Sequence, residues 1–132
     1  MNKKIQAFTL AELMIVLVII GILVLLALPN LMPLISKAKS TEAKIHLEHI
    51  YNLEKSHFYM YSKYTNDLQA IGYQQEELIT EGGGANYLLT VELLNAGTYV
   101  AKATSVVDFD NDGVYNVWQI NERKELLETS PD

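Results

Sequence analysis

The stretch that decides the fold is AFTLAELMIVLVIIGILVLLALPN, which runs from Ala7 to Asn30. Every residue from Leu13 to Leu28 is apolar or glycine, and the run continues to Ile35 with one polar side chain in 23 residues. This length is sufficient for an α-helix to cross a bilayer. Glu12 stands at the leading edge of the run. A charged side chain inside a membrane costs about 2.5–3.5 kcal/mol on insertion scales, so we expect this carboxylate to have a function that offsets its cost.

Two common kinds of N-terminal apolar segment leave Glu12 unexplained. A secretory signal peptide begins with basic residues, which Lys3 and Lys4 supply, and ends in a cut after small residues. The one candidate cut, after Ala27, has the bulky Leu25 at the third position before it and is therefore a poor match. A plain membrane anchor would be long enough, but it has no use for the carboxylate.

A third interpretation uses the carboxylate. Lys3-Lys4-Ile5-Gln6-Ala7 followed by Phe8-Thr9-Leu10-Ala11-Glu12 and an apolar run resembles the prepilin signature of type IV pilins and of type II secretion and DNA-uptake pseudopilins. The resemblance is strongest from Ala7 to about Ala43. It implies that a prepilin peptidase in the membrane cuts before Phe8 and methylates the new amine. The family usually has glycine where this chain has Ala7, and alanine is the next smallest residue.

The resemblance also gives Glu12 a role in assembly. It implies that Glu12 of one subunit meets the terminal ammonium of Phe8 in a neighbouring subunit. Such a buried pair adds little net stability, but breaking it leaves an unpaired charge that costs about 3–5 kcal/mol. We therefore expect the pair to fix the stagger between subunits of a helical homo-oligomer. An inner-membrane assembly platform is the other partner that the family implies.

The helix is expected to continue beyond the membrane, from about Thr9 to Ser62. Pro29 and Pro33 each lack a backbone N–H, so a helix bend or local melting is expected there. Beyond Pro33 the pattern is amphipathic, with Glu54 as a polar intruder. The apolar stripe consists of Ala43, Leu47, Ile50, Tyr51, Leu53, Phe58, Tyr61 and Tyr64.

The remaining sequence predicts a loop followed by a small antiparallel sheet. Turn signals separate expected strands at 87–94, 98–107 and 114–120 and a short edge strand at 125–127. The predicted fold class is α+β, a long N-terminal helix with a membrane-spanning first half and an amphipathic second half packed on the sheet. The predicted parts are a leader (1–7), a hydrophobic assembly helix (8–35), its amphipathic continuation (36–63) and the head (64–132).

An aspartate-rich turn, Asp108-Phe109-Asp110-Asn111-Asp112-Gly113, is a candidate metal site. Alternating aspartates can surround one Ca²⁺ ion, and the glycine permits a sharp turn. The match to an EF-hand loop fails at its last position, where the pattern needs glutamate and this chain has Gln119. We therefore expect a Ca²⁺ site of another kind at Asp108, Asp110 and Asp112, with a solvated acidic turn as the alternative.

Charge is unevenly distributed along the chain, whose net charge is −6. Residues 36–63 hold five lysines and three glutamates, whereas residues 64–132 hold twelve acids and three bases. The acidic head argues against nucleic-acid binding by the head alone. The lysines are placed to approach anionic lipid or the acids of a neighbouring chain. The chain has no cysteine, which excludes disulfides and thiolate metal sites.

These observations predict a non-enzymatic structural subunit of a type IV filament, either a major pilin or a major pseudopilin. The subunit is expected in the inner membrane before assembly and in a periplasmic or cell-surface filament afterwards. The alternative is a single-span, membrane-anchored calcium-binding periplasmic module that does not polymerise. Only the filament interpretation uses Ala7, Phe8 and Glu12.

Overall fold

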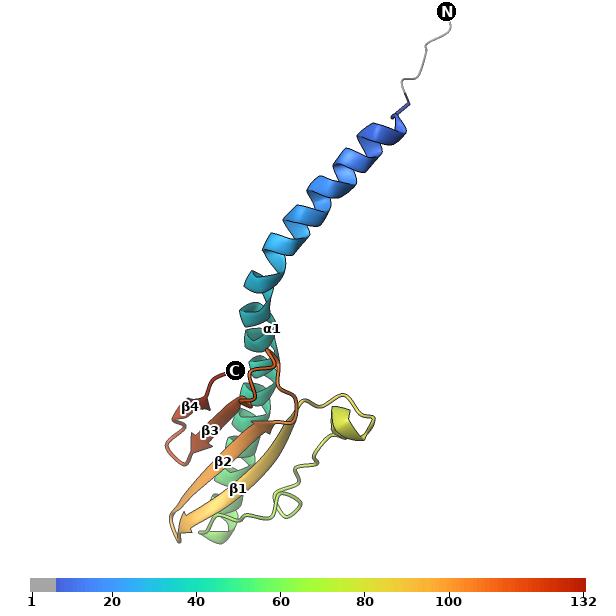
Figure 1. Ribbon diagram of the computed structural model, residues 1–132. Helices are drawn as coiled ribbons and strands as arrows, with labels where there is room; N and C mark the ends of the chain where they lie inside the picture. The colour runs from blue at the N-terminus through green and yellow to red at the C-terminus, as the bar shows by residue number, and fades with distance from the viewer. Residues whose placement is uncertain (1–6) are drawn as a thin grey trace, which may run out of the picture. The chain divides into compact units, whose positions relative to one another are not determined.

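The computed structural model describes residues 7–132 (Figure 1). The predicted leader therefore lies outside the described residues, apart from Ala7. The elements in chain order are the helix α1 (Leu10–Tyr61), the 3-10 helix η1 (Ile79–Glu81), and the strands β1 (Tyr87–Asn95), β2 (Thr98–Ser105), β3 (Val117–Asn121) and β4 (Leu126–Ser130). The predicted α+β class is confirmed, and the bounds of α1 lie within one residue of those expected.

The chain divides into two compact units, one ending at Met32 and one covering Pro33–Asp132. The first unit contains the N-terminal part of α1. Its segment Leu10–Pro29 is the one stretch in residues 7–132 that is long and apolar enough to cross a membrane. All side chains of this segment are exposed within the single chain. Burying a Val, Leu or Ile side chain is worth about 1.5–3 kcal/mol relative to leaving it in water, so we expect lipid or protein to surround this surface.

Two prolines lie within the helix, at positions 29 and 33. The chain is helical at both residues. A missing N–H at each proline removes one i→i−4 hydrogen bond without ending the helix. A bend at Pro29 and Pro33 stays a prediction.

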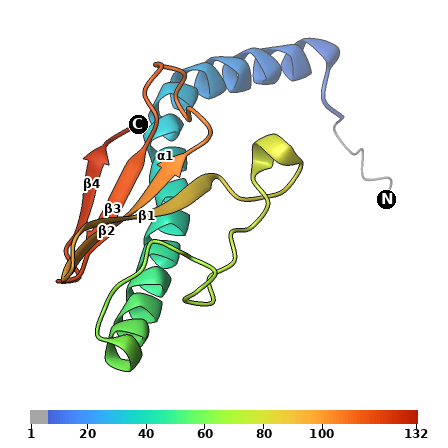
Figure 2. The ribbon, with the colours of Figure 1, turned by 90° about the horizontal axis from the view of Figure 1, so that it is seen from below.

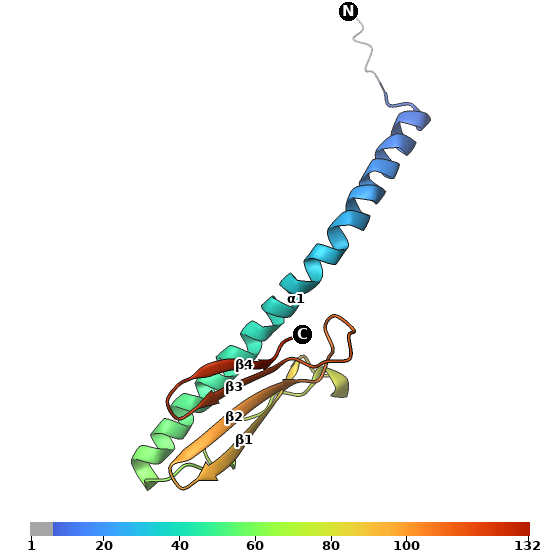
Figure 3. The same cartoon turned by 60° about the vertical axis from the view of Figure 1, so that its left-hand side comes forward.

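The second unit contains a four-stranded antiparallel sheet in the order β1-β2-β3-β4. Each strand pairs with the next along the chain, with Tyr87 opposite Ser105, Ala103 opposite Trp118, and Ile120 opposite Leu126. One face of this meander packs on the C-terminal part of α1 (Figure 3). The β1–β2 and β3–β4 connections are short hairpins, whereas the longer β2–β3 connection carries the aspartate-rich turn.

The core lies between α1 and the inner face of the sheet. From the helix, Ala43, Leu47 and Ile50 are fully buried, as the apolar stripe predicted. Facing them are the inward residues of the sheet, which include Tyr87, Leu89, Tyr99, Ala101, Ala103 and Ile120. The alternation of buried and exposed residues along β2 reflects the two-residue period of a strand. Glu54 is also fully buried, whereas Tyr61 is 60% exposed at the end of the helix, so the stripe ends earlier than expected.

The strands differ from the sequence expectation at their ends. β2 ends at Ser105 and not at Val107, and β4 extends to Ser130, beyond the expected short edge strand. β3 begins at Val117, which corrects the expected start at Val114. The cause lies at Asn116, whose buried side chain accepts a hydrogen bond from Tyr87 Oη at 2.7 Å and donates to Ser130 O at 3.0 Å. A local strand pattern carries no sign of these distant partners.

Candidate functional site

The N-terminus of α1 is closed by a reciprocal pair of hydrogen bonds. The Thr9 N–H donates to Glu12 Oε2 at 2.8 Å, and the Glu12 N–H donates to Thr9 Oγ at 3.2 Å. This is a capping box, in which two N–H groups that the helix leaves without partners are satisfied. The signature Thr9-Leu10-Ala11-Glu12 is readable in the sequence, but the sequence interpretation missed it. Glu12 therefore has a local role as well as the assembly role that the resemblance implies.

Ala7 and Phe8 precede this cap and are outside the helix. Phe8 is 82% exposed. A peptidase needs its substrate backbone free of a hydrogen-bonded helix, so the Ala7–Phe8 bond has the accessibility that processing requires. The cap at Thr9 then defines where the helix of a processed chain would begin.

The aspartate-rich turn lies in the connection between β2 and β3, beside the C-terminus (Figure 3). Asp108 organises the turn, because its two oxygens accept hydrogen bonds from the N–H groups of Asn111 at 2.6 Å and Gly113 at 2.8 Å. Gly113 has φ +88°, which is a conformation that favours glycine. The turn is thus held by side chain to backbone hydrogen bonds of the kind that aspartate forms well.

The structure adds a fourth carboxylate to the three expected ones. Asp132 accepts hydrogen bonds from the N–H groups of Phe109 at 2.9 Å and Asp110 at 3.2 Å. One oxygen from each of Asp108, Asp110, Asp112 and Asp132 lies within 4.8 Å of the others. The sequence interpretation missed Asp132 because nothing in its local context marks it, 20 positions after Asp112.

Oxygens this close together could share one cation, because Ca²⁺–O distances of about 2.3–2.6 Å place opposite ligands at most about 5.2 Å apart. Loss of water and the three neighbouring carboxylates raise the pKa of Asp110. Crowded like charges of this kind are relieved by a divalent cation, although the hydrogen bonds within the turn also hold it together without one.

Glu54 is a second polar feature whose surroundings the sequence did not reveal. Its side chain is fully buried, Oε2 accepts a hydrogen bond from the Thr65 N–H at 3.2 Å, and Oε1 has no hydrogen-bond partner. Burial raises the pKa of Glu54, and the bond from Thr65 and the charge of His57 oppose this rise. Glu54 thus ties the segment after α1 back to the helix at an electrostatic cost.

Comparisons with known proteins support the resemblance seen in the sequence. Residues 2–28 match the family model of the prokaryotic N-terminal methylation motif. The chain is 34% identical over 116 residues to the type IV major pilin protein PilA of Myxococcus xanthus (strain DK1622). The alignment covers 84% of this chain and 51% of the relative, so the chain spans about half the length of the curated relative that it matches. No solved structure gives a significant match.

Proposed function

We propose, on the basis of the type IV pilin family that the methylation motif and the PilA relative support, that this chain is a structural subunit of a type IV pilus. The observation that carries the proposal is the N-terminal segment. It combines the methylation motif, an exposed Ala7–Phe8 bond, Glu12 and a 20-residue apolar helix whose side chains are all exposed. A pilus subunit uses every one of these features.

The proposed mechanism has a membrane stage and a filament stage. The peptidase cuts before Phe8, and the apolar helix holds the processed subunit in the inner membrane with the head outside the cytoplasm. Assembly moves the helix from lipid into contact with the helices of other subunits. Both environments bury the same apolar surface, so the transfer costs little hydrophobic free energy. The role is structural and involves no catalysis by the subunit.

Glu12 sets the height at which an incoming subunit aligns with its neighbours in the filament. The capping bond with Thr9 engages Oε2, and among residues 7–132 no hydrogen bond is formed to Oε1. The proposal is that the methylated Phe8 ammonium of a neighbouring subunit lies against this carboxylate. A subunit that inserts at the wrong height leaves both charges unpaired in a dry core, which is strongly disfavoured.

The test separates the charge of Glu12 from its capping role. Glu12→Gln retains the capping box, since glutamine serves at this position, but removes the charge. Glu12→Leu removes both. If the charge pair directs assembly, both variants accumulate in the inner membrane while filaments in the sheared surface fraction fall by at least about 100-fold, as expected for an unpaired buried ammonium that costs about 3–5 kcal/mol.

The two variants also define the contradicting outcomes. Filament formation by Glu12→Gln at the parent level would mean that Glu12 acts as a helix cap and not as a charge partner. Parent-level assembly of Glu12→Leu would remove Glu12 from the mechanism. A parent chain that stays in the membrane and forms no filament in any condition would favour the membrane-anchored calcium-binding module.

We further propose that the aspartate turn binds Ca²⁺. The support is the set of four carboxylate oxygens within 4.8 Å of one another, an all-oxygen ligand set of the kind that Ca²⁺ takes. Asp108, Asp110 and Asp112 would hold the ion together with Asp132. An ion shared by the turn and Asp132 would hold the β2–β3 connection to the C-terminal segment. No disulfide can do this, since the chain has no cysteine.

A further inference from the structure

A group of three lysines and a group of three glutamates in the second unit lie on opposite flanks of α1. Lys37, Lys44 and Lys55 recur at intervals of 7 and 11 residues, which brings them within about 20° of one another around a helix of 100° per residue. We call these three residues the lysine flank. They lie on the side of β3 and β4, because Lys37 and Lys44 line the same hollow as Trp118, and Lys44 Nζ lies 4.2 Å from the centroid of that ring.

The segment between α1 and β1 lies on the other side of the helix. Glu42 fixes it by accepting hydrogen bonds from Asn86 at 2.8 and 2.7 Å, and Tyr73 Oη lies 3.1 Å from Nδ1 of His46. Glu42 and His46 are about 150–170° from the lysine flank at 100° per residue. Figures 1 and 2 agree with this arrangement, with the segment on one side of α1 and β3 and β4 on the other.

This segment carries negative charge that has no ion-pair partner among residues 7–132. Residues 64–86 contain four acidic residues and no lysine or arginine. Glu76, Glu77 and Glu81, which we call the acidic loop, are all exposed. Among the ion pairs of residues 7–132, none includes a residue of the acidic loop or of the lysine flank. A hollow of about 700 Å³ adjoins the acidic loop and has room for a long side chain.

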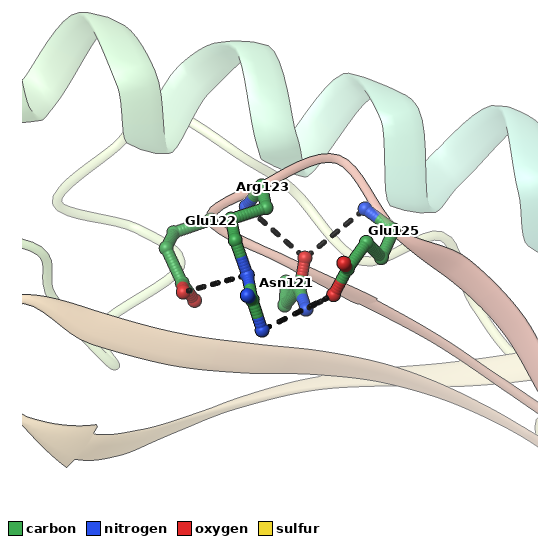
Figure 4. A network of polar contacts seen from close by, with 4 residues as sticks. All are labelled: Asn121, Glu122, Arg123 and Glu125. Carbon is green, nitrogen blue, oxygen red and sulfur yellow. Dashed lines mark hydrogen bonds and ion pairs between the residues drawn. The ribbon is translucent and has the colours of Figure 1, made fainter.

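The carboxylates near the lysine flank are already engaged elsewhere. Arg123 pairs with Glu122 at 3.7 Å and with Glu125 at 3.4 Å, in a network that Asn121 completes (Figure 4). Glu128 accepts a hydrogen bond from Asn116 at 2.7 Å. Glu48 is exposed on the same side of α1, so three lysines and this one glutamate leave the flank with a net positive charge, and the acidic loop keeps its negative charge.

We propose that the lysine flank of one subunit docks on the acidic loop of a second copy of this chain. The contact is head-to-tail because the two patches lie on opposite flanks, and a heterologous contact of this kind extends into an open helical assembly. The inference rests on the proposed pilus function and adds the surface by which neighbouring heads recognise each other. An anionic lipid surface could attract the lysines, but it gives the acidic loop no role.

The energy per contact is modest and the consequence for assembly is large. A single exposed ion pair contributes about 0.2–1 kcal/mol, whereas like charges brought together at an interface cost several kcal/mol. The contact recurs at every subunit of a filament, so it selects correct neighbours and raises the rate of association more than it adds stability.

The test reverses each patch in the full chain, in cells that assemble the parent. One variant carries Glu76→Lys, Glu77→Lys and Glu81→Lys, a second carries Lys37→Glu, Lys44→Glu and Lys55→Glu, and a third carries all six. Glu92→Lys is the matched control, because Glu92 is an exposed acid on β1 outside both patches and its exposed pair with Lys102 contributes little. The readout is filament in the sheared fraction relative to subunit in the membrane.

We expect the amount of filament to fall at least about tenfold in each variant with one reversed patch. In the variant with all six substitutions it should return to within about threefold of the parent, because the two patches are again complementary in charge. Glu92→Lys should assemble at the parent level. The acidic-loop variant retains the lysines that cover Trp118 and Tyr51, so its failure cannot be ascribed to lost packing of the lysine flank.

Three outcomes overturn the inference. Parent-level assembly of both single-patch variants does so while leaving the pilus function intact. Loss without recovery in the six-fold variant does so as well. Loss of filaments by the lysine variant alone, with normal assembly of the acidic-loop variant, would assign the lysines to a different partner such as anionic lipid. A parent that forms no filaments contradicts the proposed function itself, which is a separate result.

Discussion

Glu54 lies on the inner side of α1 with its carboxylate fully buried and one oxygen without a partner. Loss of water is the main cause that raises its pKa above that of an exposed glutamate. The folded head therefore binds this proton more tightly than the unfolded chain does. By linkage, the free energy of unfolding falls as the pH rises from the unfolded pKa through the raised folded pKa.

Glu54→Gln should remove this pH dependence. Glutamine keeps an acceptor for the Thr65 N–H but carries no charge at any pH. We expect the variant head to be more stable than the parent above the raised pKa, by about 1–3 kcal/mol for relief of an incompletely paired buried carboxylate, and similar to it below the unfolded pKa. Urea unfolding of residues 36–132, which contain the whole buried core, measures this between pH 4 and pH 8.

Glu48→Gln is the control, since Glu48 is an exposed glutamate on the same helix. It should leave the pH profile close to that of the parent. A Glu54→Gln head with the parent's slope against pH would show that Glu54 is not the group that titrates.

Asp110 tests the calcium proposal. Its carboxylate is crowded by three others, so without an ion it adds repulsion. An ion that binds only the folded head stabilises it by about 2.7 kcal/mol at a hundredfold excess over Kd. The melting temperature of the parent head should therefore rise with free Ca²⁺. The Asp110→Ala head should lose most of that rise, and in the presence of a chelator its melting temperature should stay close to that of the parent.

Magnesium at equal concentration separates ion recognition from charge screening. We expect a much smaller rise with Mg²⁺, because Mg²⁺ demands near-ideal octahedral geometry and gives up its water reluctantly, whereas Ca²⁺ accepts irregular sets of oxygen ligands. A parent melting temperature that stays constant across Ca²⁺ concentrations would mean that the four aspartates form only a hydrogen-bonded acidic turn.

At the scale of elements, the bounds of α1 and its buried residues could be predicted because they depend on local periodicity. Ala43, Leu47 and Ile50 repeat at helical intervals and are buried as expected. The start of β3 could not be predicted, because Asn116 is held by Tyr87 and Ser130, which are far away in the sequence. Asp132 joined the aspartate turn for the same reason, through contacts that only the folded chain creates.

The segment between α1 and β1 contains a glycine that the backbone requires. Gly83 donates a hydrogen bond to Leu78 O at 2.9 Å, and a Cβ at Gly83 would lie 1.9 Å from Glu77 O. The sequence showed the run Gly82-Gly83-Gly84 as a turn signal without indicating which glycine the backbone needs.

Gly83→Ala should therefore distort the turn and lower the free energy of unfolding by about 1–3 kcal/mol, as overpacking typically does. Gly84→Ala is the matched control, because a Cβ at Gly84 meets nothing within 4 Å and its φ is not positive. Urea unfolding of both heads is the measurement. Equal stability of the two variants would show that the close approach at Gly83 relaxes freely.

At the scale of the whole molecule, the two compact units place different demands on their surroundings. The second unit encloses its own hydrophobic core, whereas Leu10–Pro29 exposes all of its apolar side chains. In the proposed pilus function, this apolar segment is buried first in lipid and then against the helices of other subunits. The opposite charges on the two flanks of the head suit the same repeated arrangement.

The chain's identity as a processed pilus subunit can be tested by mass spectrometry of the N-terminus in filaments sheared from cells. The account predicts that assembled chains begin at Phe8 with a methylated amine and have lost residues 1–7. A variant with a bulky residue at the cleavage site, Ala7→Leu, should remain unprocessed in the membrane. An intact Met1 in assembled material, or a chain that begins after Ala27, would contradict the account.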